Sequence, residues 1–360
     1  MQDGPMSRWL SPLLAFCLSF MLITTFSPVI GLQIDRQLDF WLLWIGLVIF
    51  LALPLIYLEF ALVKRAKTTV LNALMSLTRD ADASVKWRLV GWFSVIFIPF
   101  LAGAMLANAS YVAEQFVALP IAVSLVFVAL AIVSLVLSFL DHKILVLLSV
   151  IAVAASIVLS FVMGRHIEAW QMTALIFPEW GKATILALVA SGLGLGVYAQ
   201  VNAESAYHDN KTTPVVLPIW FAQLASVVAF GFFAIQTPAP AISIVVAVVF
   251  GAALLLKLAR QQLADRKLAV VVQYATIVLP VVLWAVPLLQ TTLNLVVLIW
   301  GLLSCLGYAI FAGWIMKISH LRKVMNFDSE WAYNIWRIAV RIVIPLSIIV
   351  AIASVFVGWF

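Results

Sequence analysis

The residues that could do chemistry in this chain are hydroxyls and helix-breaking residues inside long apolar stretches. One group is Thr24-Thr25-Phe26-Ser27-Pro28, and the other is Ser191-Gly192-Leu193-Gly194-Leu195-Gly196. Proline removes a helical hydrogen bond, and each glycine costs a helix interior about 1 kcal/mol relative to alanine. Interrupted helices in a membrane free backbone groups that can bind a solute. The alternative is that both breaks serve only helix packing. The candidate substrate-binding residues are Thr24, Thr25, Ser27, Gly192, Gly194 and Gly196.

Two further polar side chains fall within apolar surroundings. Glu59 is a candidate for a hydrogen-bonding role within the helical bundle, because an acid at membrane depth is costly and indicates a function by default. Its alternative is to reach the membrane surface, where Lys64 and Arg65 follow within two turns. Asn108 is a further candidate for binding substrate, although it could equally bond a neighbouring helix.

Residues for catalysis or metal binding do not form a recognisable set. The sequence has no nucleophile elbow, P-loop or HExxH motif. Cys17 and Cys305 are far apart in apolar runs, and the 4 histidines fall in polar connectors. We therefore predict that the protein is not an enzyme and that it uses no cofactor and no metal.

Composition places these residues in a membrane protein. Of the 360 residues, 65% are apolar and 10% are charged, whereas roughly 25% are charged in a soluble domain. This excludes a soluble enzyme, a disordered chain and a nucleic-acid-binding protein. A lipid-exposed backbone must satisfy its own hydrogen bonds, so long apolar stretches predict helices. Eleven such stretches occur, at about 9–30, 40–62, 89–113, 119–140, 144–163, 183–203, 214–235, 240–260, 268–288, 294–316 and 338–358.

The basic residues predict how these helices are oriented. With the N-terminus in the cytoplasm and alternating spans, the inner side collects 18 of the 21 Lys and Arg residues. Only Arg36, Arg165 and Lys182 remain outside. Because cytoplasmic loops are enriched in Lys and Arg, this asymmetry predicts a cytoplasmic N-terminus and an external C-terminus.

The two breaks also predict a repeat. They fall in the first and sixth spans, and an odd separation gives two halves of opposite topology, with a binding site at the midplane. We expect an all-α polytopic protein with one transmembrane domain, 1–360. It would contain a five-plus-five inverted repeat, at about 9–163 and 183–316, and an extra helix at 338–358.

Alanines in place of the three glycines should straighten the sixth span and stabilise it as a helix.

The stretch from Leu51 to Leu62, with Pro54 and Leu58-Glu59, resembles the end of the second helix of neurotransmitter:sodium symporters. Further landmarks follow in the same order, at Arg88–Trp92, Ser205–Asn210 and Trp336–Pro345. The resemblance implies a divergent member of that family, with the inverted-repeat transporter fold, in a bacterial inner membrane. It also implies that Glu59 holds the broken helices and that Tyr198 lines the substrate pocket.

The departures from this family concern its ion sites. The resemblance leaves Thr24 and Gln223 as weak ion-binding candidates, and the centre of the eighth span, at 245–253, lacks Ser and Thr. A hard cation needs several converging oxygen ligands, so sodium coupling is doubtful.

We expect a secondary-transporter-like protein for an amino acid or a similar small organic solute. The alternative is a non-transporting regulatory or scaffolding protein derived from the same fold. A homo-oligomer or a membrane partner stays open.

Overall fold

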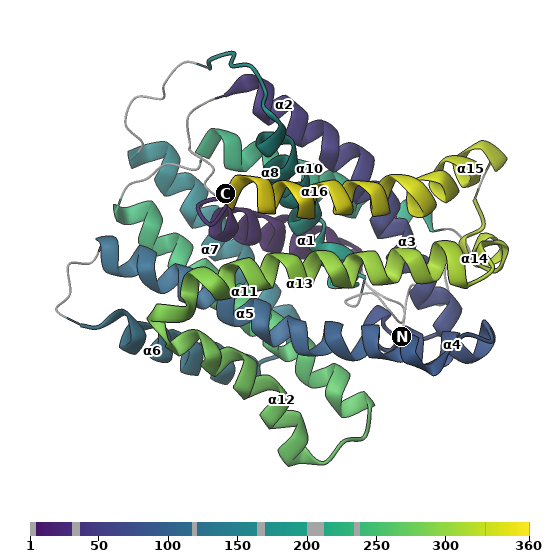
Figure 1. The fold of residues 1–360 in the computed structure, drawn as a ribbon. Coiled ribbons are helices and arrows are strands. Elements are labelled where there is room, and N and C mark those ends of the chain that lie inside the picture. The colour runs from purple at the N-terminus through teal and green to yellow at the C-terminus, as the bar shows by residue number, and fades with distance from the viewer. Residues whose placement is uncertain are drawn as a thin grey trace.

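The computed structural model describes residues 5–30, 37–116, 121–163, 170–199, 212–233, 238–327 and 329–359, and these form a bundle of long helices (Figure 1). Within these ranges, the β-type backbone pairing consists of one isolated parallel bridge between Gln37 and Gln171. The α-helices are α1 (Pro5–Phe26), α2 (Leu38–Leu47), α3 (Leu53–Ala66), α4 (Val70–Asp80), α5 (Arg88–Phe116), α6 (Val123–Leu137), α7 (His142–Met163), α8 (Phe177–Ala190), α10 (Thr213–Phe233), α11 (Pro238–Asp265), α12 (Val270–Val282), α13 (Gln290–Ile310), α14 (Ile318–Met325), α15 (Glu330–Ile338) and α16 (Ile344–Trp359).

Each apolar stretch of the sequence contains a helix, so the prediction of an all-α multi-pass membrane protein is confirmed. Within the described ranges, 8 helical segments are long and apolar enough to cross a membrane. Two apolar helices, Val123–Leu137 and Val270–Ala285, are shorter. The remaining stretch contains α8, which has 14 residues and ends at Ala190. At 1.5 Å per residue α8 spans about 21 Å, less than the ~30 Å hydrocarbon core.

Two of the spans contain a widened turn just before a proline. The π-helical segment Val48–Ala52 joins α2 to α3 ahead of Pro54, and Ala339–Val343 joins α15 to α16 ahead of Pro345. Proline has no N–H group and its ring crowds the carbonyl four residues earlier. A π-turn accommodates this local disruption without ending the helix. Both spans therefore continue past their prolines.

The centre of the bundle is formed by helices from distant parts of the chain. Helix α11 packs against α5 and α7, while α1 packs against α10, α7 and α8. Met21 of α1, Met105 of α5 and Gly251 of α11 meet there: a Cβ atom on Gly251 would lie 2.8 Å from the Met21 sulfur and 3.4 Å from the Met105 methyl. Apolar side chains fill this meeting point of the first, third and eighth predicted spans.

The basic connectors meet at one end of the bundle. Helices α4, α14 and α15 lie together there, on the right in Figure 1. Arg65 pairs with Asp80 at 3.2 Å, and Arg322 pairs with Glu330 at 2.7 Å. Arg266 donates to Asn72 Oδ1 at 2.6 Å and lies 4.2 Å from the Trp92 ring centroid. This end, called the basic end below, collects side chains that the sequence assigns to the cytoplasmic side. Arg36, Arg165 and Lys211 lie outside the described residues.

We expect a topology reporter fused after residue 75, in α4, to read as cytoplasmic and one fused after Phe360 to read as external. The physical reason is the retention of Lys and Arg on the cytoplasmic side during insertion. Alkaline phosphatase and green fluorescent protein fusions report the two sides in opposite ways. A cytoplasmic signal from both fusion points would mean that the segment between residue 75 and Phe360 crosses the membrane an even number of times, which contradicts the predicted nine crossings.

Candidate functional site

The glycine run interrupts the helix at α8, as the sequence predicts. Helix α8 ends at Ala190, and the backbone then enters a short 3-10 turn, Gly192–Gly194. Gly192, Gly194 and Gly196 have φ values of +74°, +68° and +72°, and Leu193 between them has φ +57°. Glycine adopts this left-handed region without the steric penalty of other residues. The break is therefore encoded locally by the residues that form it.

The expectation that alanines would straighten this segment stays a prediction, but alanines would be strained in the conformation that the segment has here. All three glycines have left-handed backbones, where an L side chain is strained. A Cβ on Gly192 would also lie 2.8 Å from the Tyr198 ring, and a Cβ on Gly196 would lie 2.8 Å from Val70 Cβ. Both the conformation and the close packing at this point require glycine.

A hydroxyl from α1 faces the break. Ser19 Oγ donates to the Ala190 carbonyl at 2.6 Å and lies 3.0 Å from Tyr198 Oη, while Tyr198 Oη donates to the same carbonyl at 2.9 Å. All three residues are fully buried. Tyr198 thus lies at the break, and its place in a substrate pocket stays a prediction. Sequence analysis missed Ser19, whose only signal is a small hydroxyl in the middle of an apolar span.

The hydroxyls of the first predicted break are bonded to their own helix. Thr24 Oγ1 donates to the Phe20 carbonyl at 2.7 Å, and Thr25 Oγ1 donates to the Met21 carbonyl at 2.6 Å. Helix α1 runs without interruption to Phe26, and the backbone N–H of buried Ser27 still reaches the Ile23 carbonyl at 2.8 Å. The residues before Pro28 therefore end α1 rather than interrupt it near Ser19, at the level of the α8 break.

Glu59 is fully buried, which excludes the alternative that it reaches the membrane surface. The basic side chains that follow it form hydrogen bonds with other residues: Lys64 donates one to Thr212, and Arg65 donates one to Asp80. The carboxyl interacts with the backbone N–H of Gly196, but neither oxygen has a hydrogen bond of normal geometry to a described residue. The interaction is therefore weaker than a hydrogen bond of normal length and angle. It nevertheless places the buried carboxyl of α3 against the broken segment.

Asn108 belongs to a separate cluster of amides between α5 and α13. Its Nδ2 donates to Asn294 Oδ1 at 3.0 Å, and its Oδ1 accepts from Gln290 Nε2 at 3.0 Å. Asn294 in turn lines a partly open cavity of about 500 Å³, together with Lys182, Thr291 and Ser354. The cavity lies beside Val29 and Ile30, which follow the end of α1. Asn108 is thus one contact away from the cavity wall.

Gln223 lies on α10 and is fully buried. Neither its amide nitrogen nor its amide oxygen has a hydrogen-bond partner among the described residues. Such a buried amide costs stability unless a ligand or water satisfies it. Within the described ranges no group of three or more His, Cys, Asp or Glu side chains could hold a metal ion.

The structure brings some predicted residues together and separates others. Gly192, Gly194, Gly196, Tyr198 and Glu59 converge on the broken segment. Asn108 instead belongs to the amide cluster. Asn294, Gln290 and Lys182 could not be found from sequence, because no motif links them to Asn108 across the intervening spans.

The arrangement of helices is similar to that of solved membrane transporters. Over 98% of both chains, the structure is similar to MhsT solved in complex with L-phenylalanine, with a TM-score of 0.64 and 14% identity. It is also similar to a mutant form of a manganese transporter of Eremococcus coleocola, with a TM-score of 0.56 and 12% identity over 100% of this chain and 90% of that one.

These likenesses concern the fold. No protein-family model matches the sequence, and no curated protein matches it either. At 12–14% identity the shared feature is the helical architecture. The chain is therefore a multi-pass membrane protein with a transporter-like fold. The Ser205–Asn210 landmark lies outside the described residues.

Proposed function

We propose that the protein is a secondary transporter that binds an amino acid or a similar small organic solute at the α8 break. The observation that carries the proposal is the meeting of freed backbone and polar side chains at one buried point. Helix α8 ends at Ala190, whose carbonyl accepts hydrogen bonds from Ser19 and Tyr198. Glu59 faces Gly196 in the same segment. Interrupted helices with polar backbone at the midplane are typical of transporter sites.

The chemistry of this segment favours a solute with a carboxylate. Leu195 has φ −87° and ψ 2°, and Gly196 follows with φ +72°. This succession of right- and left-handed residues directs neighbouring N–H groups to the same side, which is a common anion-binding geometry. The Gly196 N–H faces Glu59, so a solute carboxylate would take the other N–H groups of the segment. We propose Gly192, Gly194, Gly196 and Tyr198 as residues around the solute, with Glu59 holding the segment. Thr24, Thr25, Ser27 and Asn108 would line its path toward the cavity beside Asn294.

The wider features of this proposal follow from the sequence. The inverted repeats would cover about 9–163 and 183–316, with 338–358 as the extra helix. The protein would lie in a bacterial inner membrane with its basic end in the cytoplasm. Its partners would be the solute and the lipid bilayer, with a homo-oligomer or a membrane partner as a further option.

Uptake should not require sodium. The two candidate ion ligands among the side chains are the oxygens of Thr24 and Gln223. The Thr24 hydroxyl already donates a hydrogen bond to the Phe20 carbonyl. A hard cation of this size is usually held by about six ligands. The test is uptake of single labelled amino acids into proteoliposomes, with sodium replaced by choline at constant ionic strength. Fixed ionic strength excludes screening as a cause.

We expect less than a twofold change in uptake between sodium and choline. A tenfold loss of solute affinity in choline, about 1.4 kcal/mol of coupling, would point instead to a sodium site built from backbone carbonyls. Uptake that depends on a pH gradient in both salts would leave the transport proposal intact and identify protons as the coupling ion.

A second function is favoured by the packing at the bundle centre. Met21, Met105 and Gly251 fill the space between α1, α5 and α11, and Ser19 and Tyr198 already satisfy the Ala190 carbonyl. A non-transporting regulatory or scaffolding protein derived from the fold needs no solute path, so apolar packing would fill the centre of its bundle in this way. Absence of both uptake and binding for all tested amino acids, in protein that unfolds cooperatively on heating, would favour this second function.

A further inference from the structure

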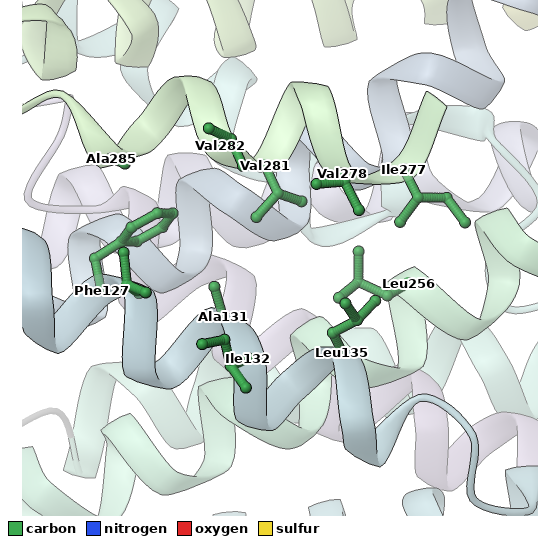
Figure 2. A pocket seen from close by; sticks show the side chains of 11 residues that line it. Phe127, Ala131, Ile132, Leu135, Leu256, Ile277, Val278, Val281, Val282 and Ala285 are labelled. Carbon is green, nitrogen blue, oxygen red and sulfur yellow. The ribbon is translucent and has the colours of Figure 1, made fainter. Parts of the chain in front are cut away.

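An apolar groove lies at the edge of the bundle, away from the α8 break. It is enclosed by α6, α11 and α12, and its volume is about 170 Å³. Figure 2 shows Phe127, Ala131 and Leu135 of α6 facing Val281 and Ile277 of α12 across it. The lining side chains are all apolar, and several at the rim are strongly exposed, namely Ile132 at 57% and Val282 at 53%.

The length of the groove matches one leaflet of a bilayer. Along α6 it extends from Phe127 to Leu135, which is about 12 Å at 1.5 Å per residue. Half of a hydrocarbon core ~30 Å thick is about 15 Å. One acyl chain that enters from a leaflet surface would therefore run along most of the groove.

Basic side chains lie one helical turn beyond the groove, toward the basic end. Leu256 lines the groove, and Arg260 follows it by four residues, on the same face of α11. Leu135 also lines it, and Phe139 follows by the same spacing, with the Arg260 guanidinium 4.0 Å from its ring centroid. Arg260 Nη2 also donates to the Ser138 carbonyl at 3.0 Å. The cation is thus fixed at the mouth of the groove.

Among the described residues, the positive charge at this mouth is neutralised only in part. Lys257 lies beside Arg260 and donates to the Leu140 carbonyl, and Lys143 is exposed nearby in sequence. The described carboxylate beside these cations, Asp141, accepts the backbone N–H of His142 at 2.8 Å. In the described part of the chain, neither Arg260 nor Lys257 forms an ion pair with a carboxylate. The excess of positive charge favours an anionic headgroup.

We propose that this groove binds one anionic phospholipid from the leaflet at the basic end, with an acyl chain between α6 and α12 and the phosphate beside Arg260. Basic sites between membrane helices on the cytoplasmic side are suited to anionic headgroups. Each methylene that leaves water for such a groove contributes favourably, but lipid tails compete equally well for it. Selectivity therefore comes from the cations, and retention comes from the shape of the groove. The proposal does not depend on whether the protein transports.

Native mass spectrometry tests the proposal on the full chain. The protein is reconstituted in vesicles of equimolar palmitoyl-oleoyl phosphatidylglycerol and phosphatidylcholine, extracted in a mild detergent, and its bound lipids are identified. We expect one phosphatidylglycerol to be retained in preference to phosphatidylcholine. Arg260→Gln should reduce this preference about fivefold, which corresponds to about 1 kcal/mol for one surface cation. Lys323→Gln, an exposed cation on α14, is the matched control and should leave it unchanged.

Filling the groove tests the acyl chain separately. Ala131→Trp from α6 and Val278→Trp from α12 should each remove the retained lipid. Val133→Trp is the matched control, because Val133 is exposed on α6 and does not line the groove. Equal lipid retention in the groove variants and the control would overturn the proposal, as would equal retention of the two lipids by the unmodified protein. A dimer that Ala131→Trp abolishes would overturn it too, since the occupant would then be a second copy of this chain.

Discussion

Replacing Gly196 with alanine should destabilise the folded protein by roughly 2 to 5 kcal/mol and abolish solute uptake. Two costs combine at this position. A left-handed backbone costs an L residue about 1–2 kcal/mol, and overpacking a buried site costs about 1–3 kcal/mol. Gly196 has φ +72°, and its Cβ would overlap Val70 Cγ2 and lie 2.8 Å from Val70 Cβ. The measurement is the midpoint of thermal unfolding in detergent, together with uptake into proteoliposomes.

A matched control separates this effect from the general effect of a glycine replacement. Gly46 lies in α2, and a Cβ there would meet no atom within 4 Å. Gly46→Ala should therefore leave stability unchanged or raise it by about 0.5–1 kcal/mol, because alanine favours the helix. Adding Val70→Ala to Gly196→Ala should recover part of the loss, since one clashing methyl is removed and the backbone strain stays. A Gly196→Ala protein as stable as Gly46→Ala would contradict the left-handed backbone at the break.

Glu59→Ala should also destabilise the protein strongly, whereas Glu59→Gln should fold. Alanine would leave a cavity in a fully buried site, and large-to-small replacements of this kind cost about 2–5 kcal/mol. It would also remove the weak interaction between the carboxyl and the Gly196 N–H. Glutamine fills the same volume and keeps an oxygen that can accept from this N–H.

The same thermal-unfolding measurement distinguishes these variants. Glu330→Ala is the control: Glu330 pairs with Arg322 on the surface, with its side chain 80% exposed, and exposed ion pairs contribute about 0–1 kcal/mol. We expect the order of stability to be Glu330→Ala, then Glu59→Gln, then Glu59→Ala. Equal losses in Glu59→Gln and Glu59→Ala would show that the negative charge itself is needed. No loss in Glu59→Ala would remove Glu59 from the structural role proposed for it.

The two predictions concern the same contact from its two sides. The conformation of Gly196 places its N–H near the Glu59 carboxyl. Neither Glu59 oxygen has a hydrogen bond of normal geometry to a described residue, so this weak interaction is the polar contact that the carboxyl has there. Coupling between the sites is therefore expected. In a double mutant of Gly196→Ala and Glu59→Gln, the combined loss should be smaller than the sum of the single losses, since residues in contact are not independent.

Sequence alone determined the features that depend on local chemistry and composition. The apolar stretches predict the helices because a backbone in lipid must bond to itself. The glycine run predicts the break after Ala190 because glycine is the residue that tolerates successive left-handed conformations. The stretch before Pro28 predicts an interruption of the first span, but α1 is continuous to Phe26 and ends there, because proline disfavours helix at the residue before it. The burial of Glu59 was open in the sequence, where Lys64 and Arg65 offered a surface alternative.

Only the tertiary structure decided what these elements contact. Ser19 meets Ala190 across 171 residues of sequence, and Asn108 meets Asn294 across 186. The groove between α6, α11 and α12 likewise combines residues from separate spans. No local pattern encodes such pairs, because in a membrane almost every helix face is apolar and hydrophobicity does not select its neighbour. The choice is made by the shapes of small residues such as Gly251 and by single hydrogen bonds, which exist only once the helices have packed.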